Sequence, residues 1–163
     1  MTVTTRILGS CLRGCSLAAM VTAAACMPAP QTGATPKAGA TMPASIVEPY
    51  LTIQTALAQD RMDEVKASAG NIATAATALG APAFKIDTTA VQLASATEID
   101  DARDKFGRLS DAIVTYMDGL HLKAPEGVRT AYCPMVQKPW MQKGDTLANP
   151  YYGTSMATCG EFR

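Results

Sequence analysis

The longest regular pattern in the chain is IDDARDKFGRLSDAIVTYMDGL, residues 99–120. Apolar residues recur in it at intervals of three and four, which is the repeat of one helix face. These residues are Ile99, Ala102, Phe106, Leu109, Ile113, Tyr116 and Leu120. Because Gly119 and Pro125 then interrupt the repeat, the stretch predicts one long amphipathic helix, with Thr97 as its N-terminal cap.

Further helices are expected before this one. The sequence SIVE is a capping box in which Ser45 and Glu48 satisfy the first turn of a helix. Asp60 is placed to cap a second helix that ends at Gly80, and a weaker helix follows Asp87. The predicted fold class is therefore all-α, an antiparallel bundle of three to four helices.

The last part of the chain loses the helical repeat. Its prolines exclude a long helix, and NPYYG predicts a turn that Asn149 begins. Pro150 fixes the next φ, and Gly153 permits a left-handed conformation at the end of the turn. We therefore expect an irregular, looped C-terminal cap on the bundle.

The first 25 residues are typical of an export signal. Arg6 and Arg13 give a positively charged segment before SLAAMVTAAA, which is an apolar run too short to cross a bilayer. The following AAAC resembles a bacterial lipobox, which predicts lipidation of Cys26 and a membrane-anchored periplasmic lipoprotein. Cleavage without lipidation is the alternative, and it would release a soluble periplasmic protein.

Three regions follow from these patterns. Residues 1–25 are the predicted signal peptide, and residues 26–44 hold the anchor cysteine and a Pro-, Ala- and Thr-rich flexible tether. Residues 45–163 form the predicted helical domain with its cysteine- and methionine-containing cap.

Charge and motif content exclude some classes of function. The 14 basic and 14 acidic residues balance, and no basic run exists to neutralise phosphates, so no nucleic-acid partner is expected. We expect no enzyme, because the chain has one histidine, no nucleophile motif and no Cys-x-x-Cys pair.

Two of the five cysteines, Cys133 and Cys159, fall in the predicted domain beyond the anchor residue. In an oxidising compartment such a pair usually forms a disulfide, which would stabilise the fold by roughly 3 kcal/mol for a loop of about 25 residues. A thiol metal site and a redox-switchable pair are the alternatives left open.

Several ordered motifs resemble one protein family. YCPM, a tryptophan, NPYYG and CG resemble the C-terminal signature of the bacterial domain of unknown function 3347 family, and YLTIQTALAQD and DDARDKFGRLS resemble its helices. The resemblance covers about residues 46–160. The signature cap comprises Tyr132, Pro134, Trp140, Asn149, Pro150, Tyr151, Gly153 and Gly160.

The resemblance implies an involvement with soft metals, because members of that family are often fused to periplasmic adaptor subunits of heavy-metal efflux systems. The implied ligands for Cu(I) or Ag(I) are Cys133, Met135, Met156 and Cys159, with Met141 as a further ligand. Where the family often has histidines, this chain has Asp101 and Lys105, which predict an ordinary i, i+4 surface pair.

Two functions are therefore expected as alternatives. The first is a periplasmic soft-metal-binding or efflux-associated accessory domain, whose partners would be a heavy-metal efflux adaptor or other envelope proteins. The second is a disulfide-stapled helical interaction module of the cell envelope with no metal role.

Overall fold

The computed structural model describes residues 34–163. The predicted signal peptide, residues 1–25, and the predicted lipidation site, Cys26, lie outside this range. Among the helices within it, none is long and apolar enough to cross a membrane.

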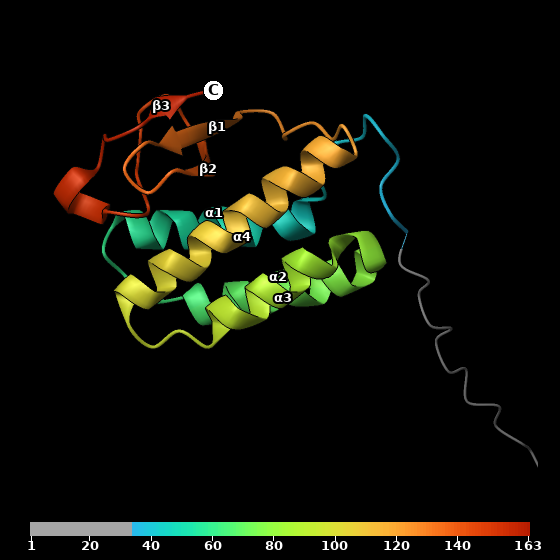
Figure 1. Cartoon of the computed structure of the whole chain (residues 1–163), viewed down its shortest axis with the longest axis horizontal. Helices are drawn as coiled ribbons and strands as arrows, with labels where there is room; N and C mark the ends of the chain where they lie inside the picture. Colours follow the sequence, from blue (N-terminus) through green and yellow to red (C-terminus); the bar gives the residue numbers. More distant parts are fainter. Residues whose placement is uncertain (1–33) are drawn as a thin grey trace, which may run out of the picture. The chain divides into compact units, whose positions relative to one another are not determined.

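Four α-helices form the larger part of the fold: α1 (Ala44–Ala58), α2 (Val65–Leu79), α3 (Phe84–Ala94) and α4 (Ile99–Gly119). Each helix packs on the next one along the chain, and the short 3-10 helix η1 (Ala81–Ala83) leads into α3 (Figure 1). The predicted long helix is confirmed as α4. Its predicted apolar face is buried at Ala102, Phe106, Leu109, Ile113 and Tyr116.

The predicted helix caps are wrong. No side-chain cap bond is made at the start of α1, which begins at Ala44, ahead of Ser45 and directly after Pro43. Asp60 has a φ of 56° and lies in the loop before Glu64, the residue that precedes α2. The Asp60 carboxylate is engaged elsewhere, because it accepts hydrogen bonds from Arg103 and from the Thr154 segment.

The all-α prediction is also wrong, because the C-terminal cap contains a three-stranded antiparallel sheet. Its strands are β1 (Val128–Cys133), β2 (Lys138–Lys143) and β3 (Glu161–Phe162), in the order β2-β1-β3. The prolines that exclude a helix are compatible with these strands. Pro134 follows β1, and Pro139 lies on an edge strand, where a missing N–H is tolerated.

The sheet packs against the helices through β2, which contacts both α1 and α4. Figure 1 shows the sheet on one side of the α1–α4 layer and α2 with α3 on the other. The Met141 backbone N–H donates to the Tyr50 hydroxyl at 3.1 Å, and the Tyr151 hydroxyl donates to the Pro139 carbonyl. Two tyrosine hydroxyls therefore cover the outer edge of β2.

The segment before α1 pairs with the segment after α4. Thr41 and Lys123 form a parallel bridge, and the Met42 N–H donates to the Lys123 carbonyl at 2.9 Å. Met42 is 1% exposed and belongs to the hydrophobic core. The folded part therefore includes residues that the sequence assigned to the end of the flexible tether.

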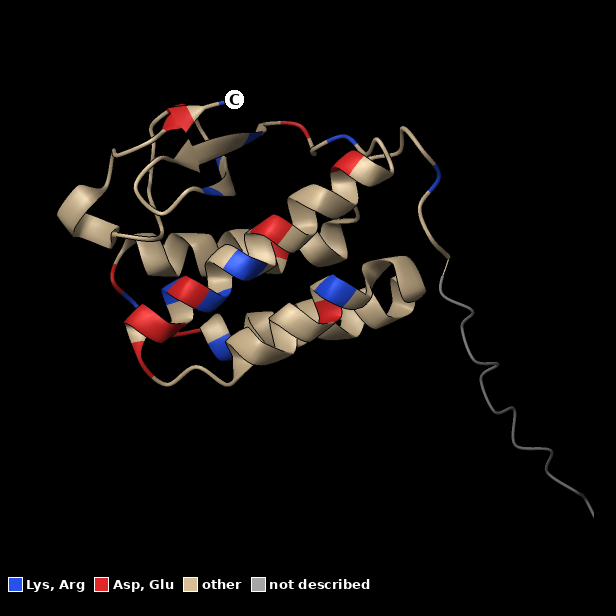
Figure 2. Cartoon of the chain, viewed as in Figure 1, with Lys and Arg blue, Asp and Glu red and all other residues tan. Residues whose placement is uncertain are grey.

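Charged residues of both signs intermix along α4 (Figure 2). Lys105 Nζ lies 2.7 Å from Asp101 Oδ2, which confirms the predicted surface pair, and Arg108 Nη2 lies 2.6 Å from Asp104 Oδ2. Exposed pairs of this kind contribute little, about 0.3–0.5 kcal/mol each. The paired charges lie on the exposed face of α4, and the opposite face is apolar and packs in the core.

Candidate functional site

The cap brings together two cysteines that are far apart in the sequence. Cys133 ends β1 and is fully buried, and Cys159 lies, partly buried, between the 3-10 helix η2 (Gly153–Met156) and β3. Both are free thiols in this structure. The predicted disulfide is thus not formed here, although its two residues are neighbours.

Cys133 affects the ionisation of Cys159. Burial raises the pKa of the Cys159 thiol, and the nearby Cys133 raises it further. A negative charge on a neighbouring group disfavours a thiolate, so Cys159 keeps its proton to a higher pH than an isolated thiol does.

A buried amide completes the environment of the sulfur atoms. Asn149 Nδ2 donates to Cys133 Sγ at 3.4 Å and to the Cys159 carbonyl at 2.6 Å. The Asn149 amide thus links the Cys133 side chain to the Cys159 backbone. The sequence identified Asn149 only as the start of a turn, because its burial against the sulfur atoms arises from tertiary packing.

The predicted turn at NPYYG is confirmed. Asn149 Oδ1 accepts from the Tyr151 N–H at 2.8 Å, and the Asn149 carbonyl accepts from the Gly153 N–H at 3.1 Å. Gly153 has a φ of 55°, and a Cβ atom there would lie 1.8 Å from Asp60 Oδ1. Glycine is therefore required both for the backbone conformation and for the close approach of Asp60.

Trp140 packs beside the thiol pair. In the antiparallel register, Trp140 lies opposite Ala131 and Cys133 lies opposite Lys138, so Trp140 and Cys133 share one face of the sheet. A Cβ atom on Gly160 would lie 2.6 Å from Trp140 Cη2. The indole therefore covers the backbone next to Cys159.

The predicted methionine ligands are placed differently from one another. Met141 is buried and lies opposite Thr130, on the other face of the sheet from Cys133, so the structure does not bring it to the thiol pair. Met135 is 63% exposed in the turn between β1 and β2, and Met156 is 37% exposed in η2. Within residues 34–163, no three His, Cys, Asp or Glu side chains gather in a group that could hold a metal ion.

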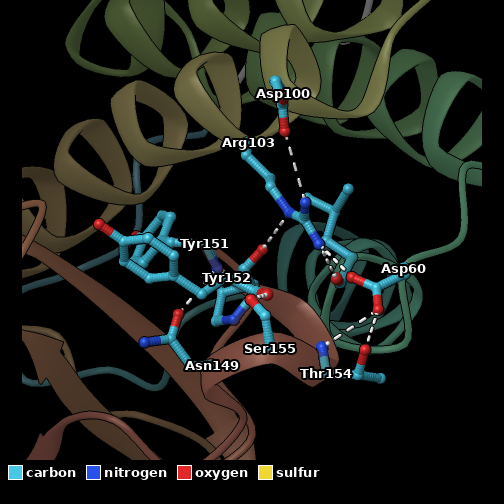
Figure 3. Close-up of polar contacts among 10 residues, drawn as sticks. Asp60, Asp100, Arg103, Asn149, Tyr151, Tyr152, Thr154 and Ser155 are labelled. Carbon is cyan, nitrogen blue, oxygen red and sulfur yellow. Dashed lines mark hydrogen bonds and ion pairs between the residues drawn. The ribbon is translucent and has the colours of Figure 1, made fainter.

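A polar cluster anchors the Asn149–Gly153 turn to the helices (Figure 3). From α4, Arg103 Nε donates to the Pro150 carbonyl at 3.3 Å, and Nη2 donates to the Leu57 carbonyl at 3.3 Å. Arg103 also pairs with Asp60, whose carboxylate accepts from the Thr154 N–H at 3.2 Å and from its hydroxyl. The hydrogen bonds from Thr154 and then Arg103 lower the pKa of Asp60.

Comparison with known proteins does not identify a family for this chain. No family model matches the sequence, and neither the curated proteins nor the solved structures gave a significant match. The resemblance to the domain of unknown function 3347 family therefore stays a prediction.

Proposed function

We propose that the protein is an exported accessory domain that binds one soft monovalent ion, Cu(I) or Ag(I), between Cys133 and Cys159. The observation that carries the proposal is the proximity of these two free cysteines, which a single Asn149 amide group links across the cap. Thiolates are the ligands that such soft ions prefer, and they suit Mg²⁺ and Ca²⁺ poorly. The motif resemblance further supports a heavy-metal efflux adaptor as the partner that would exchange the ion.

The geometry supports a two-coordinate site in which the cysteines are the essential ligands. Both thiols must lose their protons when the ion binds, and Asn149 already donates a hydrogen bond to Cys133 Sγ. Because the pKa of Cys159 is raised, affinity should increase as the pH rises toward and through that pKa. Met135 is largely exposed and is not required.

A Cu(I) titration under anaerobic conditions tests the proposal. The reduced full chain would compete with a chromophoric Cu(I) chelator, and we expect uptake of one ion at this site that Cys133→Ser and Cys159→Ser each abolish. Met135→Leu is the matched control in the same cap and should retain the affinity. Since the chain has five cysteines, uptake that persists in the Cys133→Ser, Cys159→Ser double variant would place the ion elsewhere and overturn the proposal.

The same proximity favours a second candidate, the disulfide-stapled interaction module. Two neighbouring free thiols, with no third ligand of the His, Cys, Asp or Glu type grouped with them in the described range, can oxidise to a disulfide. Under oxidising conditions the bond would stabilise the fold by roughly 3 kcal/mol. Thiol counting and urea unfolding, with and without reductant, measure this.

The two candidates are distinguished by the reduced state. A pair that stays oxidised in mild reductant, and that takes up no Cu(I) even after full reduction, would favour the structural disulfide. Reversible oxidation together with Cu(I) uptake by the reduced pair would favour the metal site.

A further inference from the structure

Two large apolar side chains are exposed on one face of α3. Phe84 is 69% exposed and Val91 is 57% exposed. Thr88 lies between them along the helix, and the spacing of four and then three residues places all three on the same face. The opposite side of α3 is buried at Ile86 and Leu93. The face of Phe84, Thr88 and Val91, the α3 outer face, is therefore open to solvent in the part of the chain that the structure describes.

The chain around the α3 outer face carries few charges. Residues 67–97 contain two charged side chains, Lys85 and Asp87, whereas charged residues make up 17% of the whole chain. Figure 2 shows this scarcity of charge on α2 and α3, in contrast to α4. Because Lys85 and Asp87 have opposite signs, the segment has no net charge. A neutral, apolar partner is the one that such a surface favours.

The exposed hydroxyls near this face are already hydrogen bonded within their own helices. Thr88 Oγ1 donates to the Phe84 carbonyl at 2.9 Å, and Thr77 Oγ1 donates to the Ala73 carbonyl at 3.0 Å. Thr77 lies beside the face, because it lines the same surface hollow as Phe84. A hydroxyl with a partner in the protein loses less on leaving water than a free hydroxyl does. Covering this surface therefore carries a small desolvation cost.

The described chain begins next to the turn that leads into α3. Thr35 Oγ1 donates to the Leu79 carbonyl at 3.2 Å (Figure 1). Leu79 is the last residue of α2, and Phe84 is the first residue of α3. The segment that precedes the fold is therefore attached at the end of the α2–α3 pair where Phe84 lies.

The predicted lipid anchor is a short distance along the chain from this point. Cys26 is eight residues before Ala34, where the described range begins. A polypeptide spans at most about 3.6 Å per residue, so Ala34 can lie no more than about 29 Å from the anchor. Lipidation of Cys26 would hold the α2–α3 turn near the bilayer. Docking within that reach is intramolecular, so a modest apolar contact is sufficient to maintain it.

We propose that the α3 outer face docks on the neutral phospholipid surface to which Cys26 is attached. Phe84 and Val91 would enter the boundary between head groups and acyl chains, while Lys85 and Asp87 would stay at the level of the head groups. The position of the predicted anchor favours the bilayer over a second copy of the chain as the occupant. This inference rests on the proposed export and the predicted lipidation, and it is independent of the thiol pair.

Quenching of tryptophan fluorescence by brominated lipids tests the proposal. The full chain, produced with its own signal, would be reconstituted after processing into phosphatidylcholine vesicles with brominated acyl chains. Phe84→Trp and Val91→Trp should each be quenched about twofold or more beyond the wild type, because both positions would lie among the lipids. Trp140 is fully buried and gives the same background in every variant. Met135→Trp, the matched control at a cap position of similar exposure, should be quenched no more than the wild type.

Several outcomes of this experiment would overturn the proposal. Equal quenching of Phe84→Trp and Met135→Trp would show that the domain has no preferred face toward the lipid. Quenching of the two α3 variants at the wild-type level would show that this face does not reach the bilayer. Mass spectrometry that finds no lipid on Cys26 would remove its basis. Absence of Cu(I) uptake with the expected quenching would contradict the proposed metal site alone.

Two comparisons separate a neutral bilayer from other occupants. Phosphatidylglycerol vesicles should give the same quenching, because residues 67–97 have no net charge, and quenching with anionic lipid alone would contradict the proposal. The Cys26→Ser chain should sediment as a monomer. A dimer that the Phe84→Gln, Val91→Gln double variant abolishes would instead assign the face to a second copy. Both substitutions are at exposed helix positions, where glutamine favours a helix at least as well as phenylalanine or valine, so the fold should be retained.

Discussion

Two buried tyrosines with opposite hydrogen-bonding states show how much the fold depends on single polar atoms. The Tyr50 hydroxyl shares a 2.6 Å hydrogen bond with Ser110 Oγ and accepts from the Met141 N–H. The Tyr116 hydroxyl has no partner among the described residues. Burial raises the pKa of both tyrosines, but only the Tyr50 hydroxyl has hydrogen bonds within the protein that replace those it would make to water.

Replacing each tyrosine with phenylalanine should therefore change stability in opposite directions. We expect Tyr116→Phe to increase the free energy of unfolding by about 1 kcal/mol, because an unsatisfied hydroxyl is removed. Tyr50→Phe, the matched control, should decrease it by about 1–3 kcal/mol because the Met141 N–H loses its acceptor. Urea unfolding measures both, and a destabilised Tyr116→Phe would show that its hydroxyl has a partner in solution.

Gly153 is a second residue at which one added carbon atom should be costly. Gly153→Ala would place Cβ against Asp60 and Arg103 in a left-handed conformation, and we expect a loss of about 3 kcal/mol. Gly127 also has a positive φ, 74°, but a Cβ atom there meets nothing within 4 Å. Gly127→Ala should therefore cost only about 1 kcal/mol, and equal losses in thermal unfolding would contradict this account.

The loop between α1 and α2 is joined to η2 by a carboxylate that should make stability depend on pH. Thr154 and Arg103 lower the pKa of Asp60 in the folded state below its unfolded value of about 3.9. This stabilisation is complete above the unfolded pKa and is lost as the pH falls through the folded pKa. Asp60→Asn should therefore destabilise the protein at pH 7, and its difference from wild type should shrink below about pH 4.

A donor variant checks the cause of this pH dependence. Thr154→Val removes the Thr154 hydroxyl but keeps the backbone N–H, so the pKa of Asp60 should rise toward its ordinary value. NMR titration of the Asp60 carboxyl measures the shift directly. The link between the two elements would be refuted if the wild-type and Thr154→Val proteins gave the same pKa.

At the level of elements, the helices were predictable and the sheet was not. The apolar repeat of α4 places Phe106, Leu109 and Ile113 in the core, as the period of three and four predicts. In β2, however, Trp140, Met141 and Gln142 are buried in succession, because both faces of the strand are covered. The strand packs on α1 and α4, and the following loop covers Gln142 through hydrogen bonds with Thr146 and Ala148. A strand buried on both faces lacks the alternation of apolar and polar residues by which a strand is recognised in a sequence.

The candidate site was predictable in part. Cys133 and Cys159 were expected as a pair, because few cysteines remain after the predicted signal and anchor, and the structure places them next to each other around the Asn149 amide. The face on which Met141 lies depends on the register of β2 with β1, which could not be assigned before the strands were known. Asn149 was missed as a sulfur partner because its contacts are with residues 10 and 16 positions away.

For the molecule as a whole, the segment before α1 matters because it pairs with the segment after α4 and so holds the start and the end of the helical part together. Met42→Ala should lower the free energy of unfolding by about 3 kcal/mol, since a fully buried side chain would leave a cavity. Met135→Ala, at an exposed position, should change it by less than about 0.5 kcal/mol. A similar small effect at both positions in urea unfolding would show that residues 40–42 do not pack in solution.

The covered edge of β2 also bears on the solubility of the protein. A sheet usually recruits further chains through a long unpaired edge strand, which is the first step of many forms of aggregation. Here one edge is covered by α1, α4 and the hydroxyls of Tyr50 and Tyr151, and the other is β3, a strand of two residues. Within residues 34–163, the sheet therefore has little edge on which a second copy could add a strand, and the folded protein should remain monodisperse at concentrations that favour intermolecular β-sheet in proteins with open edges.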